Sequence, residues 1–463
     1  MIVSIVLAAG EGTRMRSQTP KVLHKICGKS LLEHVLDCLK DLKSDKQVVI
    51  VGHKGDAVRE YFRNRESIVF VDQPVGKEYP YGTGFAVKCA AHEFSDEDTV
   101  LILNGDAPLI SKDTLRDLLE YHNKGLFSCT VLTAHINNPK GYGRILRDKS
   151  SFLEKIVEEN DATAEEKLIT EVNSGVYVFK GKDLLNSIDE ISADNNKGEL
   201  YLTDVIEILK GKGKKVGAFA TSNEKEILGI NSKVELESVG RIMRNEINTE
   251  YMREGVVIVG VQNTYIDKGV KIGRDTVIFP GALIEGESVI GENVTIKGFT
   301  HIVNSEIKDG SNIESSVIED SIVGQNVKIG PFAHLRPNSK ICDNAKIGNF
   351  VEIKNTNIGE GSKASHLTYL GDSDVGAGVN IGCGVITVNY DGKNKFRTTI
   401  EDGAFVGCNA NLIAPVSVGK DAFIGAGSTI TDDVGSGDLA IGRARQEIKV
   451  SWVTKKNNME GQK

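Results

Sequence analysis

Residues suited to phosphate and metal chemistry follow two apolar segments in the N-terminal part of the chain. The run Ile2–Leu7 leads directly into the glycine-rich turn Ala8–Met15 (AAGEGTRM), whose backbone N–H groups could cradle phosphate oxygens. Lys21 follows Pro20, whose fixed φ makes the lysine a well-placed cation for the same oxygens. Asp106 comes just after a second apolar segment. A carboxylate there suits Mg²⁺, which takes few protein oxygens and bridges to substrate phosphates.

Each of these residues also has a purely structural interpretation. A glycine turn after a strand, a solvated lysine and a carboxylate that caps a helix are common without any ligand. Arg14 adds a guanidinium suited to phosphate, but the Walker A GKS/T and dinucleotide GxGxxG patterns are missing. Taken one at a time, the residues leave both interpretations open.

A second polar cluster lies at Ser362–Asp372 (SKASHLTYLGD). A neutral imidazole at His366 can take a proton from an attacking amine at neutral pH. Arg336 and Lys354 fall one coil apart in the repeat described below, and a shared anion such as a sugar phosphate would offset their repulsion. The segment Val388–Lys393 interrupts that repeat, since thirteen residues separate Thr387 from Ile400, and a binding loop would do the same. The alternatives are a structural histidine, a structural excursion, and a domain that serves only as a scaffold or trimerisation stalk.

The first group of residues requires an α/β domain to position it. Short apolar runs predict strands, and amphipathic segments between them predict helices at 31–42 and 114–122. This alternation predicts a Rossmann-like parallel sheet with helices on both faces, and ligands bind beyond the carboxyl ends of such strands. The predicted strands are 2–7, 47–51, 68–71, 99–103, 128–134 and 175–179.

The second group requires the staircase of aliphatic residues that runs from Tyr265 to about Val434. Its period of six predicts a hexapeptide repeat, in which three short strands make one triangular coil of a parallel β-helix. No single coil can bury its apolar face, so only the stack is stable. The step slips by one residue near Ile307. The first in-register residues are Ile266, Ile272, Ile278, Ile284, Ile290, Ile296 and Ile302.

The chain therefore divides into an α/β domain at 1–229, a linker helix at 230–252, and a β-helix with a C-terminal tail at 253–463. Ser232 and Glu235 have the spacing of a capping box. The polar tail after Trp452 is expected to fray. The apolar stripe of the linker helix is predicted at Val234, Val239, Ile242, Met243 and Ile247.

Composition excludes several functional classes. A formal net charge of −8 over 463 residues argues against a nucleic-acid partner, because phosphate binding needs a basic face. Seven cysteines without CxxC spacing favour reduced thiols in a cytoplasmic enzyme over disulfides or a zinc site. The N-terminal residues show no signal-peptide pattern, and no stretch approaches a membrane span, so we predict no membrane partner.

Together the motifs resemble a known family. LAAGEGTRM followed by Pro20-Lys21 is similar to the signature of sugar-1-phosphate nucleotidyltransferases, and NGDAPL, GYGR, IVEE and VNSG follow in that family's order. Across residues 1 to about 450 the chain resembles the bifunctional family that joins N-acetylglucosamine-1-phosphate uridyltransferase to glucosamine-1-phosphate acetyltransferase. PKVLHKICGK, GNFVEIKN, SHLTYLGD, VNIGCG and TVNYDGKNKF match its pattern. The β-helix of that family is left-handed.

The resemblance implies two reactions. In the C-terminal domain glucosamine 1-phosphate would take an acetyl group from acetyl-CoA, with His366 as general base. In the N-terminal domain N-acetylglucosamine 1-phosphate would attack UTP, with Mg²⁺ held by Asp106 and Asn231. The product, UDP-N-acetylglucosamine, is a precursor of peptidoglycan and lipopolysaccharide. Implied contacts to this product are Leu7, Ala8, Ala9, Gly10, Arg14, Lys21, Gln73, Gly82, Thr83, Asn104, Gly105, Asp106, Gly143, Glu158, Asn173 and Asn231. Implied contacts to the amino-sugar phosphate are Arg336, Lys354, Tyr369 and Asn380, and to acetyl-CoA Cys383, Asn389, Tyr390, Cys408, Ala426 and Arg443.

The chain departs from the family's usual pattern in several places. The segment Pro74–Pro80 is longer than expected, which makes Gln73 the least secure of the implied contacts. Glu11 stands where a lysine is frequent, which places more of the phosphate binding on Arg14, Lys21 and the metal. Asn104 stands where a tyrosine is common. Cys383 replaces the usual alanine and Cys408 the usual serine, and a thiol is the weaker hydrogen-bonding partner.

By analogy with the family, we expect a homotrimer with the acetyl-transfer site between subunits. One alternative function is a nucleotidyltransferase for another pair, such as glucose 1-phosphate and dTTP, with an accessory acyltransferase domain. Another is a regulatory module built from the same two domains. Intact Lys21, Asp106, Asn231 and His366 argue against the regulatory interpretation.

Overall fold

A computed structural model describes residues 1–76, 78–149 and 152–460. The chain divides into two compact units, Met1–Met243 and Arg244–Lys463, and the division falls inside helix α7 (Lys233–Arg253). Among the described residues, no helix has both the length and the apolar character needed to cross a membrane.

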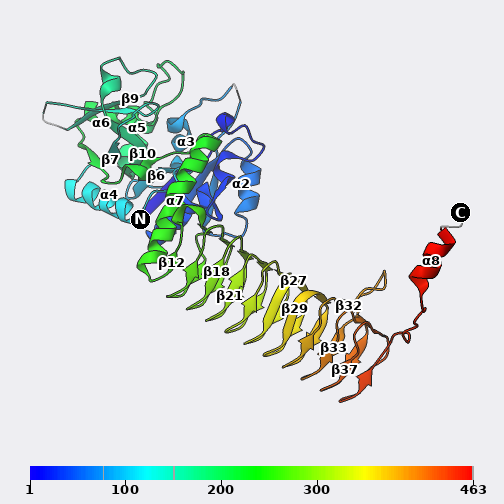
Figure 1. The fold of residues 1–463 in the computed structure, drawn as a ribbon. Coiled ribbons are helices and arrows are strands. Elements are labelled where there is room, and N and C mark those ends of the chain that lie inside the picture. Colours follow the sequence, from blue (N-terminus) through cyan, green and yellow to red (C-terminus); the bar gives the residue numbers. More distant parts are fainter. Residues whose placement is uncertain (77, 150–151, 461–463) are drawn as a thin grey trace. The chain divides into compact units, whose positions relative to one another are not determined.

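The first unit is built on one β-sheet with helices on both faces (Figure 1). The strand order is β11-β7-β10-β6-β1-β4-β5, and β8 and β9 form an added hairpin. The strands are β1 (Ile2–Leu7), β4 (Lys46–Val51), β5 (Ile68–Asp72), β6 (Thr99–Asn104), β7 (Cys129–His135), β8 (Arg144–Arg147), β9 (Leu153–Val157), β10 (Glu171–Lys180) and β11 (Val216–Ala220), and a separate hairpin pairs β2 (Lys25–Ile26) with β3 (Lys29–Ser30). The helices are α1 (Leu31–Asp41), α2 (Gly55–Tyr61), α3 (Thr83–Cys89), α4 (Lys112–Gly125), α5 (Gly181–Ile188) and α6 (Asp204–Gly211).

The predicted strands and helices of this unit are confirmed, and the predicted parallel pairing holds for β6, β1, β4 and β5 and for β7 and β11. The sheet as a whole is mixed, which corrects the expectation of an entirely parallel one. Strand β10 runs antiparallel to both β6 and β7, and β8 and β9 are also antiparallel. A parallel pair needs a crossover of a dozen or more residues, usually a helix. Between β7 and β10 the described chain contains the β8–β9 hairpin and the short 3-10 helix Glu166–Leu168 but no α-helix, so β10 returns antiparallel to β7.

Alternating side chains of the central strands fill two apolar cores. Val3 and Ile5 of β1 pack on one face of the sheet, and Val6 packs on the other. All three are fully buried. In-register pairing of β1 with β6 places Leu7 beside Asn104, so the two strands end together. This shared carboxyl edge is where the glycine-rich turn and Asp106 leave the sheet.

The second unit is a three-sided stack of short parallel strands, shown as successive rungs from β12 to β37 in Figure 1. One face contains β12 (Val257–Ile258), β15 (Val277–Ile278), β18 (Thr295–Lys297), β21 (Asn312–Glu314), β24 (Lys328–Ile329), β31 (Asn380–Ile381), β34 (Phe405–Val406), β37 (Phe423–Ile424) and β39 (Leu439–Ala440). The second contains β13 (Tyr265–Ile266), β16 (Leu283–Glu285), β19 (His301–Val303), β22 (Val317–Glu319), β25 (His334–Leu335), β32 (Ile386–Val388), β35 (Asn411–Ile413) and β38 (Thr429–Ile430). The third contains β14 (Lys271–Ile272), β17 (Val289–Ile290), β20 (Glu306–Ile307), β23 (Ile322–Val323), β26 (Lys340–Ile341), β28 (Asn357–Ile358), β30 (Ser373–Val375), β33 (Thr398–Ile400) and β36 (Val416–Val418).

The hexapeptide prediction is confirmed residue by residue. Ile284 pairs with Ile302, Ile302 with Ile318, and Ile318 with Leu335, and all four side chains are fully buried. The slipped step near Ile307 keeps its place in the stack. Each aliphatic side chain therefore contacts its equivalents in the coils above and below, as expected for a repeat that buries its core only by stacking.

Two strands of the stack are longer than the rest and turn a corner. β27 (Lys346–Lys354) pairs at its start with β24 and at its end with β25, which lie on different faces. β29 (Lys363–Gly371) pairs with β27 over nearly its whole length. At the corner, Phe350 and Leu367 adopt positive φ values of 58° and 34°. Bulky residues rarely occupy this region, so the coils fix an unusual backbone there.

Three predictions for the connecting helix and tail need correction. Ser232 accepts the N–H of Glu235, but the Glu235 carboxylate accepts from Asn231, so the capping box is not reciprocal. Val234, predicted in the apolar stripe, is 77% exposed, because it lies in the first turn of α7 away from the buried Val239 and Met243. Of the tail expected to fray, the described part is helical as α8 (Trp452–Glu460), and residues 461–463 lie outside the described residues.

Candidate active sites

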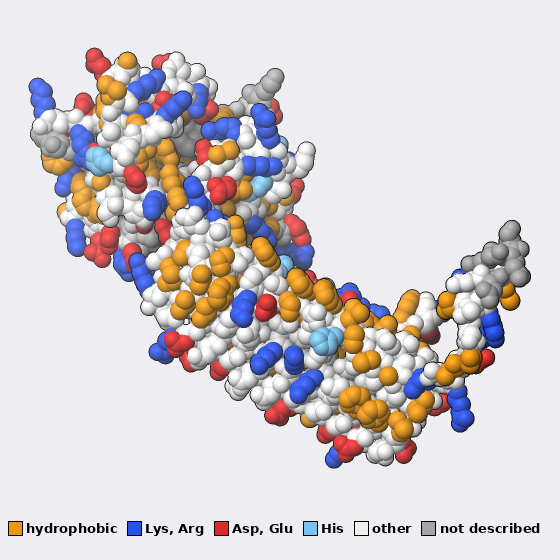
Figure 2. Space-filling view, viewed as in Figure 1, with side chains coloured by type: hydrophobic (Ala, Val, Ile, Leu, Met, Phe, Trp, Pro, Cys, Tyr) orange, Lys and Arg blue, Asp and Glu red, His pale blue; other side chains and the backbone are white. Residues whose placement is uncertain are grey.

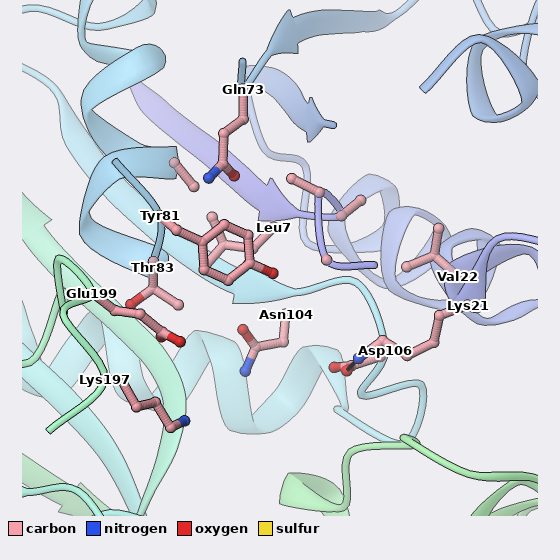
Figure 3. A pocket seen from close by; sticks show the side chains of 15 residues that line it. Leu7, Lys21, Val22, Gln73, Tyr81, Thr83, Asn104, Asp106, Lys197 and Glu199 are labelled. Atoms are coloured by element: carbon pink, nitrogen blue, oxygen red, sulfur yellow. Dashed lines mark hydrogen bonds and ion pairs between the residues drawn. The ribbon is translucent and has the colours of Figure 1, made fainter. Parts of the chain in front are cut away.

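The carboxyl edge of β1 and β6 forms one wall of a cavity of about 360 Å³ (Figure 3). Lys21 and Asp106 meet at one end of it, whereas Gln73, Tyr81 and Thr83 lie toward the other. Ten residues expected to bind the nucleotide sugar line this cavity: Leu7, Ala8, Ala9, Gly10, Lys21, Gln73, Gly82, Thr83, Asn104 and Asp106. The fold therefore brings together segments that are far apart in the sequence, such as those of Lys21 and Asp106.

Two glycines allow the close packing around this cavity. Gly82 has φ 121°, and a Cβ there would lie 2.4 Å from the carbonyl oxygen of Leu200. Gly175 has φ 78°, and a Cβ there would collide with the amide of Asn104, which lies over the Ser174 carbonyl. Only glycine fits both the backbone conformation and the available space. Gly105 extends the same edge, and its N–H donates to the carbonyl of Leu7.

The predicted metal ligands are held together by a lysine. The ammonium of Lys21 makes a short ion pair with Asp106 and lies 3.2 Å from the amide oxygen of Asn231. The side chains of Lys21 and Asp106 are only 15% and 16% exposed. A cation thus already lies between the two oxygen donors, which fits a site for a divalent metal. Within the described residues no group of three or more His, Cys, Asp or Glu side chains could hold a metal, so a bound ion would need substrate or water oxygens as well, as Mg²⁺ does.

The expected sugar contacts form a second group. The carbonyl of Gly143 accepts the N–H of Asn173, and the Cβ that Gly143 lacks would lie 3.5 Å from Oε1 of Glu158. The Asn173 amide donates to the hydroxyl of Tyr177. Burial raises the pKa of Glu158, although the hydroxyl of Thr203 opposes this by donating to it. A half-buried carboxyl that accepts hydrogen bonds suits a sugar hydroxyl or an N-acetyl group.

Arg14 differs from the other expected contacts. It lies exposed on the 3-10 helix Thr13–Met15, outside the lining described for the cavity. Tyr81, Lys197 and Glu199 do line the cavity, but they were not expected from the sequence. Burial, then Glu11 and Glu199, raise the pKa of Tyr81. Lys197 and Glu199 could not be predicted from the sequence, because they lie in a polar segment before α6 that contains no recognisable motif.

The second candidate site lies on the corner made by β27 and β29. The side chain of His366 is exposed, and its Nδ1 lies 3.0 Å from Oδ1 of Asn349 in the preceding coil. The Thr368 hydroxyl donates to the carbonyl of His366 at 2.7 Å. Tyr369, predicted to contact the sugar, follows on the same strand, and its ring lies against Gly371. Asn380 begins the neighbouring strand β31.

The predicted cations Arg336 and Lys354 stack in adjacent coils. The pairing of Leu335 with Ile353 places Arg336 directly beside Lys354, and Arg336 makes an ion pair of 2.9 Å with Glu352. Lys395, and then Arg336, hold the pKa of Lys354 below its usual range. Lys395 therefore joins this cationic group, although it lies much further along the chain. The sequence did not predict Lys395 or Glu352, because the first lies in the excursion and the second is one of many surface carboxylates.

The excursion between β32 and β33 is confirmed, and it closes through an antiparallel bridge between Tyr390 and Lys395. The buried Asn389 donates to Asp372, which also accepts from Asn355. Burial opposes ionisation, but these two donors hold the pKa of Asp372 below its usual range. Tyr390 is 57% exposed, so the tip of the excursion is open for contact.

The remaining residues expected at the coenzyme form a column. The carbonyl of Cys383 accepts the N–H of Asn409, and that of Cys408 accepts the N–H of Gly427, which places Cys383, Cys408 and Ala426 in successive coils. Cys408 and Ala426 are exposed, as is Arg443 further on. Cys383, Cys408 and Ala426 all have small side chains, so this column projects little from the coils.

Comparison with known proteins identifies the class of both units. Residues 4–198 match the family described as MobA-like NTP transferase domain. Residues 320–355 and 397–432 match the bacterial transferase hexapeptide family. The chain is thus a nucleotidyltransferase joined to a left-handed parallel β-helix of transferase type, which confirms the predicted fold class.

Relatives similar over their whole length narrow the class to one family. The chain is 50% identical over 459 residues to "Bifunctional protein GlmU" of Clostridioides difficile, which covers 99% of each chain. It is 49% identical to the protein of that name from Shouchella clausii and 48% identical to one from Listeria monocytogenes, with 98% of each chain covered in both cases. The chain belongs to the bifunctional GlmU family. The predicted combination of a uridylyltransferase with an N-acetyltransferase is thereby confirmed.

Proposed function

We propose that this chain makes UDP-N-acetylglucosamine in two steps at separate sites, with Mg²⁺ in the first unit. We assign uridylyl transfer to residues 1–229, the connection to 230–252 and acetyl transfer to 253–463. The observation that carries the nucleotide half is the convergence of Lys21, Asp106 and Asn231 at the carboxyl edge of the sheet. The observations that support the acetyl half are the contact of His366 with Asn349 and the register of Arg336 with Lys354.

In the first unit, catalysis depends on position and charge. N-acetylglucosamine 1-phosphate attacks the α-phosphate of UTP, a new P–O bond forms, and pyrophosphate leaves. A bound Mg²⁺ would neutralise phosphate charge, held by Asp106 and Asn231 together with substrate oxygens. Lys21 lies beside both ligands and supplies a fixed positive charge for the phosphates. Glu158 and Asn173 hold the sugar in line for attack.

In the second unit, His366 removes a proton from the amine of glucosamine 1-phosphate as it attacks the thioester of acetyl-CoA. The N–C bond forms, the C–S bond breaks, and the coenzyme leaves as a thiolate that then takes a proton. Arg336 and Lys354 bind the phosphate of the sugar, and their register in adjacent coils lets one anion bridge them. The column Cys383–Cys408–Ala426 lines the path of the coenzyme.

We further propose that the protein acts in the cytoplasm as a homotrimer through the β-helix. Figure 2 shows hydrophobic side chains exposed over the coils of the second unit. Phe332 stacks on Phe350 at 5.5 Å, and Phe405 stacks on Phe423 at 4.5 Å, yet these rings are 38–59% exposed. Contiguous exposed aromatic rings are typical of surfaces that bind another chain. Sedimentation of the purified protein tests the number of subunits.

Two substitutions test the division of labour. We expect His366→Ala to abolish coenzyme release from acetyl-CoA while uridylyl transfer to preformed N-acetylglucosamine 1-phosphate continues. We expect Asp106→Ala to do the reverse. One variant that loses both activities while its circular dichroism stays normal would contradict separate sites. A preference for glucose 1-phosphate and dTTP in the same assay would support the alternative substrate pair.

A further inference from the structure

The imidazole of His366 is held by one neighbouring amide. Its Nδ1 lies 3.0 Å from Oδ1 of Asn349. An amide oxygen has no hydrogen to give, so the ring nitrogen must be the donor. The contact therefore selects the tautomer that carries its proton on Nδ1, and it leaves the lone pair on Nε2.

The backbone holds both partners in fixed positions. Asn349 pairs directly with His366 in the register of β27 and β29, the two strands that continue through the corner. Phe350 and Leu367, which follow the two residues, share the same left-handed backbone. A hydroxyl from Thr368 holds the carbonyl of His366 from the other side. The amide and the ring are thus aligned by two stacked coils and do not depend on a mobile loop.

We propose that Asn349 is a positioning residue for acetyl transfer, which keeps Nε2 of His366 unprotonated and aimed outward toward the attacking amine. This rests on the proposed role of His366 as general base. Without the acceptor at position 349 the ring can rotate and can carry its proton on either nitrogen. The form protonated at Nε2 has no outward basic atom, so only part of the enzyme would be competent.

The test combines kinetics with a direct measurement of the tautomer in the full-length protein. We expect Asn349→Ala to lower the kcat of acetyl transfer about tenfold, the size expected for loss of one orienting hydrogen bond. KM for glucosamine 1-phosphate and acetyl-CoA should change less than about twofold, because a positioning residue acts through the ring. Uridylyl transfer should be unchanged.

A matched control is available in the same β-helix. Asn357 donates to Asp374 of the next coil at 2.6 Å, so Asn357→Ala removes a comparable bond between coils away from His366. It should leave both activities unchanged. Asn349→Asp keeps an acceptor oxygen at position 349. It should retain the Nδ1–H tautomer and more acetyl transfer than Asn349→Ala.

Nitrogen-15 NMR of the imidazole side chains reads the tautomer without any substitution at Asn349. The signal of His366 is assigned by its loss in His366→Gln, and we expect its proton on Nδ1. A proton on Nε2 in the unaltered protein would overturn the inference, as would a normal kcat in Asn349→Ala. If His366→Gln itself retained full acetyl transfer, the proposed function of the histidine would fail instead.

Discussion

Replacing Lys21 by methionine should strengthen the binding of a divalent metal to the free enzyme. In the free enzyme the lysine ammonium contacts both Asp106 and Asn231, so an incoming metal must displace it. The ion pair is nearly buried, with side chains 15% and 16% exposed. Two unit charges about 4 Å apart attract by about 4 kcal/mol at an effective dielectric constant of 20. Desolvation offsets most of this, which leaves about 1–2 kcal/mol, or about a tenfold gain in metal affinity.

Titration of the nucleotide-free protein with Mn²⁺, followed by electron paramagnetic resonance or calorimetry, measures this gain. The same variant should lose uridylyl transfer by about 10²–10³-fold, because a fixed charge that stabilises the phosphates is gone. Lys29→Met is the matched control, since Lys29 makes a similar ion pair of 2.7 Å with Asp37 outside the cavity lining. If Lys21→Met bound Mn²⁺ as weakly as the unaltered protein, the lysine would not compete with the metal.

Three further outcomes follow from the same structure. Burial, then Glu207, raise the pKa of Asp204 to about 6. The folded state therefore holds a proton that the unfolded chain has released, and stability falls as the pH rises from about 4 to 6. Asp204→Asn should gain about 1–2 kcal/mol at pH 7, after allowance for solvent screening, and nothing at pH 4, as measured by calorimetry. Ile318→Ala should cost about 2–5 kcal/mol in urea unfolding, because its side chain is fully buried in the β-helix, whereas the half-exposed Ile322→Ala should cost much less. Removal of divalent metal with EDTA should stop uridylyl transfer and leave acetyl transfer intact when each reaction is assayed separately. Loss of both activities would show that the metal does not act in the first unit alone.

The repeat could be predicted because its information is local. An aliphatic residue recurs at every sixth position, and three such repeats make one coil. The spacing of Ile284 and Ile302 is therefore enough to identify them as neighbours in the stack. The direction of β10 could not be predicted, because it depends on which distant strand it meets. The motif residues of the nucleotide cavity could also be predicted from local sequence. Leu7 and Asp106 each lie at or just after the end of a strand, and the ends of neighbouring parallel strands meet at one edge of the sheet.

Other parts of the sites depend on packing that no local pattern records. Asn349 lies in a motif segment, but its contact with His366 exists only because two coils stack in register. Lys395 reaches Lys354 only because the excursion folds back. Arg14, by contrast, lies in a recognisable motif, but the motif does not determine whether its side chain faces the cavity, and the side chain is exposed.

The excursion 389–397 leaves the stack at one corner and returns without disturbing it, since Val388 and Thr398 on either side keep their ladder partners Ile413 and Val416. Insertions at its exposed tip, near Tyr390, should therefore disturb the coils little as long as the buried Asn389 keeps its bond to Asp372. Evolution, or an engineer, can therefore lengthen or exchange the tip of this segment while the coils that hold His366 stay as they are.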